Sequence, residues 1–295
     1  MRGYRLTEGD RQIFEASKLD GSIFTSFYFS EPGGSPLIKP WKFDDWQLKF
    51  HHALQPTHSI VGGMGAGKTA GVAMSAAVWA ATTPSFKFAD VAPTANQSWQ
   101  MFIFLRDRLH EGIPYYDRFI VKMVEKPYPR IYLYNNSVME FLSADKSAQK
   151  IKNLEADWIC LDQAEDVNDL TETIRNIGTR MRGTRPDGVP RLSRLTLLAN
   201  SSDSPEFWEM YDRMEIDPDT YLSYTASTYD NKHNTPEQMR LLESRAGGNV
   251  KDIDQHLRAK RPIGSGEYFP NAAIEGCMEP ALDRIMESGK GKPGY

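Results

Sequence analysis

The chain has 295 residues, of which 40% are hydrophobic and 25% are charged, and its formal net charge is −4. This length and balance are typical of one large globular domain, or of a core with a small satellite, and they exclude a disordered chain. DNA-binding domains that act alone are usually basic. The negative charge therefore argues against tight DNA binding by the whole surface and leaves room for transient contact through a local basic strip.

Cysteine content and apolar stretches narrow the class further. Cys160 and Cys277 are the only cysteines in the sequence, and they show neither the dense spacing of a disulfide scaffold nor the spacing of a zinc site. The longest apolar stretch, 72–81, is too short to span a bilayer, and residues 1–10 contain no apolar run of the secretory type. We therefore expect an intracellular protein that does not contact a membrane.

The first part of the chain predicts two helices with an irregular segment between them. Residues 7–19 form the first helix, with Thr7 as its N-cap and Gly21 at its exit. A Pro- and Gly-rich run breaks 22–40 into short extended pieces. A second helix is expected at 43–54.

Apolar residues four positions apart define one face of this second helix. They are Trp46, Phe50 and Leu54.

Strands and helices alternate through the middle of the chain. Strands are expected at 58–61, 86–92, 158–161 and 194–199, and helices at 68–81, 97–109 and 169–182. Two further strands, 130–134 and 137–142, flank Asn135-Asn136, which is a hairpin signal. This alternation predicts an α/β fold with a mostly parallel central sheet covered by helices on both faces.

The composition changes near residue 220. Two short helices, 236–242 and 250–260, are separated by Gly247-Gly248 and predict a small helical lid. The Gly-, Lys- and Pro-rich end, 288–295, reads as a linker.

One short motif carries the strongest chemical signal, because it fits the pattern G-x-x-x-x-G-K-[ST] between an apolar strand and a helix. Glycines let successive backbone N–H groups point at phosphate oxygens, the lysine places a cation at the β- and γ-phosphates, and the hydroxyl binds Mg²⁺. The alternative is a chance Gly-rich turn. The motif consists of Gly62, Gly63, Met64, Gly65, Ala66, Gly67, Lys68 and Thr69.

A nucleotide hydrolase also needs a carboxylate for the metal and a group that handles the attacking water. Asp162 ends the apolar run 158–161 and is the candidate Mg²⁺ ligand, with a turn or capping role as the alternative. Gln163 stands where many such ATPases have Glu; it can orient a water but cannot accept a proton as a carboxylate would. Glu165 is the candidate base, or an ordinary solvated acid.

Several further short segments accompany the phosphate-binding motif, or P-loop. They are Trp46-Gln47 before the P-loop, 92–97 (Ala-Pro-Thr-Ala-Asn-Gln), 141–144 (Phe-Leu-Ser-Ala), 154–158, 162–165 (Asp-Gln-Ala-Glu), 197–202, 228–231 (Thr-Tyr-Asp-Asn) and 266–270 (Gly-Glu-Tyr-Phe-Pro). They occur in the order found in the large terminase subunits of tailed bacteriophages. Each is weak alone, and their shared order is the specific evidence. From about residue 40 onward the chain therefore resembles the motor part of that family.

The resemblance implies roles for these residues. Trp46 and Gln47 would read adenine, the P-loop would bind ATP with Mg²⁺, and Asn200 and Ser201 would couple nucleotide state to movement. The partners would be double-stranded DNA, the portal protein, the small terminase subunit and further copies of the chain in a ring, in the host cytoplasm with transient docking on the procapsid portal.

The resemblance also implies a division of the chain. The chain would contain four parts: an N-terminal region with the adenine-reading segment (1–57), a P-loop ATPase core (58–220), a lid (221–262) and a linker (263–295) toward a nuclease domain beyond Tyr295. No acidic cluster in the sequence replaces that nuclease, so we expect no DNA cutting from this chain.

The chain departs from the family pattern in its positive charges. The arginine often found inside the P-loop is absent, since Met64 and Ala66 stand at variable positions, and Lys152-Asn153 replaces an Arg-Gly pair. Candidates for an arginine finger or a DNA contact are Lys152, Arg180, Arg182 and Arg185. For each arginine, the alternative is a solvated basic helix end.

Two other functions remain open at this point. One is a cellular helicase or recombination ATPase, although the chain has only one motor core. The other is a module that binds nucleotide without hydrolysing it, for which Gln163 is the only support.

Overall fold

The fold is described from a computed structural model of the chain. It describes residues 7–19, 23, 42–111, 119–144, 154–179, 181, 184–185 and 188–262. Several sequence predictions lie outside these ranges: Gly21, the segment 22–40 apart from residue 23, Lys152, Arg180, Arg182 and everything beyond residue 262.

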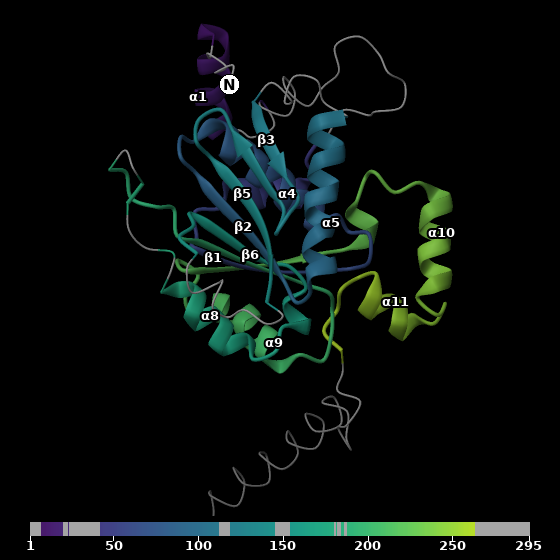
Figure 1. Ribbon diagram of the computed structural model, residues 1–295. Helices are drawn as coiled ribbons and strands as arrows, with labels where there is room; N and C mark the ends of the chain where they lie inside the picture. The colour runs from purple at the N-terminus through teal and green to yellow at the C-terminus, as the bar shows by residue number, and fades with distance from the viewer. Residues whose placement is uncertain are drawn as a thin grey trace, which may run out of the picture. The chain divides into compact units, whose positions relative to one another are not determined.

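An eight-stranded sheet forms the centre of the molecule, with the order β3-β4-β5-β2-β6-β7-β1-β8 (Figure 1). The strands are β1 (Thr57–Gly62), β2 (Lys87–Ala92), β3 (Ile120–Val124), β4 (Arg130–Leu133), β5 (Val138–Ser143), β6 (Trp158–Leu161), β7 (Arg194–Ala199) and β8 (Tyr221–Ala226). From β5 to β8 all neighbours are parallel, whereas β3, β4 and β5 pair antiparallel. The predicted α/β class with a mostly parallel sheet is confirmed.

Helices cover both faces of this sheet. The helices around the sheet are α1 (Glu8–Leu19), α3 (Asp45–His52), α4 (Lys68–Thr82), α5 (Ala95–Arg106), α8 (Leu170–Gly178) and α9 (Pro205–Asp212), and two later helices, α10 (Pro236–Arg245) and α11 (Val250–His256), contain no buried residue. Alternate residues of β6 point to opposite faces, so Trp158 packs with α3 and α4 while Ile159 packs with α8 and α9. Figure 1 shows α5 on one side of the sheet and α8 and α9 on the other.

The central strands match their predicted ranges, because they are continuous apolar runs buried on both faces. All residues of β6 and β7 are buried. Between β4 and β5, Asn136 adopts the left-handed conformation with φ of 66°, as the predicted hairpin requires.

The second helix is shorter than the apolar pattern suggested. It ends at His52, and Ala53 is already extended (φ −61°, ψ 135°). Pro56 disfavours helical backbone at the residue before it, Gln55, so the helix cannot continue. Leu54 consequently lies beyond the helix and is 93% exposed, so it does not belong to the helix face that the spacing of Trp46, Phe50 and Leu54 predicts.

Among the strands and α-helices of the described ranges, β3, β8 and α9 were not predicted. The strand β8 pairs with β1 along its whole length, so the sheet continues past residue 220 before the chain enters α10 and α11. Other boundaries shift by a turn: α5 passes into a π-helical turn at Asp107–Glu111, and α8 ends at Gly178. No helix in the described part of the chain is long and apolar enough to cross a membrane.

Candidate functional site

The phosphate-binding motif lies where the parallel strands end. Strand β1 leads into the loop, and α4 begins at Lys68. Gly67 caps this helix in the left-handed conformation (φ 81°), which a glycine adopts without strain. The predicted strand-loop-helix arrangement is therefore present, with the positive end of α4 directed at the loop.

The ammonium group of Lys68 is held inside this loop. It donates to the carbonyl oxygens of Gly62 at 2.8 Å and Gly63 at 3.2 Å, and to Oδ1 of Asn200 at 2.9 Å. Burial lowers the pKa of Lys68 to about 8, although Glu165 and Asp162 act in the opposite direction. The negative charge of a bound phosphate would stabilise the protonated form of Lys68 and so oppose this effect of burial on its pKa.

Thr69 and Asp162 form the pair expected of a magnesium site. The Thr69 hydroxyl donates to Oδ2 of Asp162 at 3.0 Å, and the Asp162 side chain is nearly buried at the end of β6. Burial raises the pKa of Asp162, against the lowering effects of the Thr69 hydrogen bond and the Lys68 charge. Hard oxygen donors of this kind fit Mg²⁺, which keeps several waters and substrate phosphates as its other ligands. No cluster of three or more His, Cys, Asp or Glu residues suited to a metal occurs among the described residues.

Glu165 is tied to the end of the neighbouring strand. Its Oε1 accepts hydrogen bonds from the backbone N of Asn200 at 2.8 Å and from Nδ2 of Asn200 at 2.7 Å. Its Oε2 is buried without a partner among the described residues. Burial raises the pKa of Glu165, while the bonds from Asn200 lower it. One carboxylate oxygen is thus fixed and the other remains available as a proton acceptor.

Gln163 has an unusual backbone and a polar neighbour that the sequence did not reveal. Its φ and ψ are 55° and 50°, a left-handed conformation that is uncommon for a residue with a side chain. Its backbone N donates to Oδ1 of Asp162 at 3.0 Å, and its Oε1 accepts a hydrogen bond from Nε2 of Gln97. In the sequence, Gln97 is distinguished only as the last residue of the 92–97 segment.

The two residues predicted to read adenine lie in different surroundings. Gln47 is buried against the P-loop: its Nε2 donates to the carbonyl of Gly67 at 3.0 Å, and its Oε1 accepts from the backbone N of Asp44 at 2.9 Å. Trp46 packs into the hydrophobic core and is 9% exposed. The structure therefore places Gln47 at the phosphate loop and Trp46 mainly in the core.

The segment after β8 closes over the loop. Thr228 donates through its hydroxyl to the carbonyl of Met64 at 2.8 Å, and Asn231 donates through Nδ2 to the carbonyl of Gly65 at 2.7 Å. Ser201 contacts the chain that follows α11, because its hydroxyl donates to the carbonyl of Lys260 at 2.5 Å. The predicted coupling segment, Asn200 and Ser201, thus touches both the P-loop lysine and the chain that follows α11.

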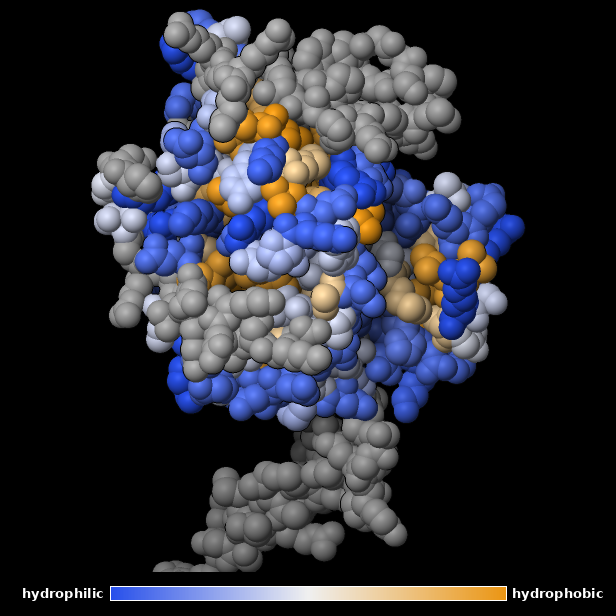
Figure 2. Space-filling view, viewed as in Figure 1, coloured by the Kyte–Doolittle hydropathy of each residue, from blue (hydrophilic) through white to orange (hydrophobic). Residues whose placement is uncertain are grey.

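Helices α10 and α11 contain no buried residue and carry apolar side chains on their outer surface. Leu241 and Val250 are 50% and 72% exposed. Figure 2 shows apolar surface on these helices, surrounded by hydrophilic side chains.

Arg185 lies at the wrong end of the sheet for a phosphate contact. Its Nε donates to Oδ1 of Asp157 at 2.9 Å, and its side chain is only 10% exposed. Arg191 binds the other oxygen of Asp157 at 3.0 Å. Asp157 precedes β6, whereas Asp162 follows it, so Arg185 forms an ion pair at the end of β6 opposite to the P-loop of its own chain, and a role as arginine finger or DNA contact stays a prediction.

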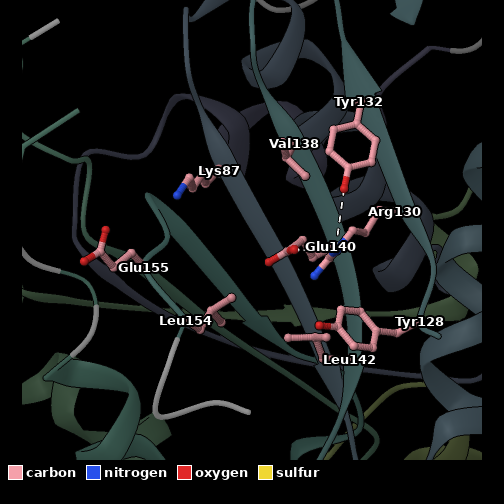
Figure 3. A pocket seen from close by; sticks show the side chains of 9 residues that line it. All are labelled: Lys87, Tyr128, Arg130, Tyr132, Val138, Glu140, Leu142, Leu154 and Glu155. Carbon is pink, nitrogen blue, oxygen red and sulfur yellow. Dashed lines mark hydrogen bonds and ion pairs between the residues drawn. The ribbon is translucent and has the colours of Figure 1, made fainter. Parts of the chain in front are cut away.

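A cavity lies away from the P-loop. It measures about 480 Å³ and is lined by β2, β4, β5 and the chain before β6 (Figure 3). At its centre Arg130 is already paired with Glu140 at 2.6 Å and stacked on Tyr128 at 4.4 Å. The guanidinium of Arg130 is thus already neutralised inside this cavity, although Lys87 also lines it.

Comparison with known proteins gives matches in structure only. No family model and no curated protein matches the sequence. The large terminase of bacteriophage HK97 aligns with a TM-score of 0.62 at 12% identity, over 88% of this chain and 56% of that chain. The large terminase ATPase domain of Thermus phage P74-26 aligns with a TM-score of 0.52 at 14% identity, over 87% of this chain and 99% of that domain.

Nucleotide complexes occur among the similar structures. The large terminase of a thermophilic bacteriophage, solved with ADP, aligns with a TM-score of 0.54 at 14% identity, over 75% of this chain and 54% of that chain. The same protein was also solved with ATP-γ-S. The chain thus spans little more than half of the whole large terminases that it matches. The family resemblance seen in the sequence is confirmed at the level of the fold, which is that of the ATPase domain of phage large terminases.

Proposed function

We propose that the chain is the Mg²⁺-dependent ATPase motor of a viral DNA-packaging terminase, which drives double-stranded DNA into the procapsid. The observation that carries the proposal is the Thr69–Asp162 pair at 3.0 Å, set at a P-loop whose lysine lies 2.9 Å from Asn200. The fold shared with large terminase ATPase domains supports the same function.

Binding of ATP would use the loop and its helix. The N–H groups of residues 62–69 and the positive end of α4 would surround the phosphates, and Lys68 would leave Gly62, Gly63 and Asn200 to contact the β- and γ-phosphates. Mg²⁺ held by Thr69 and Asp162 would neutralise charge that develops on the phosphates. Gln47 and Trp46 would border the adenine side.

Hydrolysis would proceed by in-line attack of water on the γ-phosphate. The free Oε2 of Glu165 would take the proton of this water, while Asn200 holds Oε1. When the γ-phosphate departs, Lys68 can return to Asn200. Because Ser201 is bonded to the carbonyl of Lys260, this change would reach the 221–262 lid.

The wider setting is also part of the proposal. DNA, the portal protein, the small terminase subunit and further copies of the chain in a ring would be its partners, in the host cytoplasm at the procapsid. The residues beyond 262 would lead toward a nuclease domain. An arginine supplied by a neighbouring copy would replace the positive charge that the P-loop lacks.

Steady-state hydrolysis of Mg-ATP, with nucleotide binding measured in parallel, tests the proposal. Wild type should turn over ATP, whereas Glu165→Gln should bind ATP and stall; Lys68→Ala should lose nucleotide binding. A wild-type chain that binds ATP but stays inert with DNA and portal present would indicate a non-hydrolysing module. Displacement of a triplex-forming strand without separation of the duplex would distinguish a packaging motor from a helicase.

A further inference from the structure

The amide of Gln97 has only one orientation that its surroundings permit. Its Oε1 accepts hydrogen bonds from the backbone N of Thr94 at 2.9 Å and from the Thr94 hydroxyl at 2.7 Å. A backbone N–H can only donate, so the oxygen end of the Gln97 amide must face Thr94 and the nitrogen end must face away. The capping box that opens α5 therefore fixes Nε2 as the outward group.

This orientation passes on to Gln163. Nε2 of Gln97 can only donate, and the atom that it contacts is Oε1 of Gln163. The acceptor end of the Gln163 amide is consequently occupied, and its Nε2 is left facing away from Gln97. In the part of the chain that the structure describes, that Nε2 donates to no acceptor, and the atom is not fully buried.

The free N–H₂ group belongs to the residue that follows the candidate metal ligand Asp162 at the end of β6. Gln163 directly follows Asp162 and donates to it through its backbone, and Asp162 in turn binds Thr69 of the P-loop. The left-handed backbone of Gln163 is strained for a residue with a side chain, and such strain is concentrated at functional sites.

We propose that Gln97 is a positioning residue that makes Gln163 a hydrogen-bond donor toward the γ-phosphate of ATP. The inference rests on the proposed function and deepens it. An amide N–H directed at an anionic oxygen is favourable, whereas an amide oxygen there is repelled. Gln163 then contributes positive dipole near a P-loop whose variable positions carry Met64 and Ala66 in place of arginine. A donor cannot take a proton from water, so that task falls to Glu165.

The substitution Gln97→Glu tests this orientation directly. A glutamate keeps the capping box with Thr94, because Glu is as suitable as Gln at that helix position. Its second carboxylate oxygen, however, can only accept, so Gln163 must turn its Nε2 toward residue 97 and its oxygen toward the phosphate. Helix and fold are thus retained while the polarity of Gln163 is reversed.

The readout is the ratio of the affinities for ATP-γ-S and ADP, measured by calorimetry with Mg²⁺, since only the former carries a γ-phosphate. We expect this ratio to fall about tenfold in Gln97→Glu, with ADP affinity little changed. The value of kcat should fall in the same variant. Gln97→Met, which removes the contact and leaves the Gln163 amide free to rotate, should give a smaller loss.

A double-mutant cycle with Gln163→Ala separates the effect from the added charge. In the Gln163→Ala background, Gln97→Glu should no longer change the affinity ratio. An unchanged ratio in Gln97→Glu alone, or an equal loss in both backgrounds, overturns the inference. If wild type binds neither nucleotide, the proposed function itself fails; normal binding with an unchanged ratio removes only the role of Gln97.

Discussion

Lys68 and Asn200 are joined by a 2.9 Å hydrogen bond between Nζ and Oδ1, across the ends of α4 and β7. The ammonium group has three donors, and the other contacts of Nζ are the carbonyls of Gly62 and Gly63. A phosphate must therefore displace at least one of these contacts to reach Lys68. Of these three partners, Asn200 also holds Glu165, so displacement of the Asn200 contact would free a residue that is bonded to the candidate base.

Replacement of Asn200 by alanine should separate binding from chemistry. One competitor for Lys68 disappears, so KM for ATP should stay the same or fall. The Nδ2 bond that helps to fix Glu165 is lost as well, so kcat should fall about 10- to 100-fold, within the range that a positioned base contributes. Steady-state kinetics of Asn200→Ala provide the measurement.

Ser202→Ala is the matched control on the same segment, because its hydroxyl accepts only a 3.4 Å bond from the backbone N of Ser204. It should behave like wild type. If Asn200→Ala keeps its kcat while Glu165→Gln loses activity, Asn200 does not position Glu165.

The pH dependence of turnover should report Glu165. Burial raises the pKa of this carboxyl above its ordinary value, and the bonds from Asn200 hold the rise in check. A base acts only when ionised, so kcat should fall as the pH drops through this raised pKa, at a higher pH than an ordinary Glu would require. In Asn200→Ala a lowering influence is gone, and the acid limb should move to still higher pH.

The measurement is kcat at saturating Mg-ATP across the acidic to neutral range for both proteins. Circular dichroism at each pH controls for unfolding. An acid limb at the same pH in both proteins would show that the titrating group is not Glu165.

Local patterns in the sequence predicted the centre of the fold and the phosphate site. Strand β6 and Asp162 could be predicted together. A continuous apolar run indicates a strand that is buried on both faces, and the first acidic residue after the run marks the carboxyl end of that strand. The P-loop could be predicted equally well, because its glycines, lysine and threonine all lie within eight consecutive residues. In contrast, the edge strand β8 is half-exposed and lacks a continuous apolar run, so its pattern was not recognised.

Contacts between distant residues could not be predicted. Gln97 and Gln163 meet because β2 and β6 are neighbours in the sheet, and no local signal marks that pairing. Arg185 illustrates the same limit: its sequence surroundings are those of a basic helix end, and only the fold brings Asp157 beneath it. A charge on a helix end and a charge in a buried ion pair look alike in a sequence.

Gly63 is required by the approach of the chain after α11. A Cβ at this position would lie 2.2 Å from the carbonyl oxygen of Leu257 and 2.3 Å from the hydroxyl of Thr228. The substitution Gly63→Ala should therefore push residues 228 and 257 off the loop and destabilise the protein by about 1–3 kcal/mol, as overpacking does. Thermal unfolding and limited proteolysis between α10 and α11 measure the two effects.

Gly178→Ala serves as the control, because, among the described residues, no atom outside its own helix backbone and chain neighbours lies within 4 Å of the added Cβ. This variant should be neutral or slightly stabilised, since alanine is the better helix former. Equal stability and protease resistance of Gly63→Ala and wild type would show that the lid does not sit on the P-loop as described.

The ion pair beneath β6 predicts a structural and not a catalytic phenotype for Arg185. Asp157 is fully buried and accepts from Arg185 at 2.9 Å, Arg191 at 3.0 Å and the backbone N of Leu192 at 3.2 Å. Asp157 keeps Arg191 as a partner when Arg185 is removed, so Arg185→Ala should cost about 1.5–3 kcal/mol of unfolding free energy, the range of one hydrogen bond to a charged group. In denaturant titrations the exposed Arg175→Ala, on α8, should change by less than about 0.5 kcal/mol.

An arginine finger would behave in the opposite way. It contacts phosphate only in the transition state, so its loss would lower kcat by orders of magnitude and leave unfolding unchanged. At a temperature where Arg185→Ala remains folded, we expect its kcat per folded molecule to equal that of wild type, because Asp157 lies at the opposite end of β6 from Asp162. A large loss of kcat at unchanged stability would restore Arg185 to the catalytic machinery and place its role in a neighbouring subunit's site.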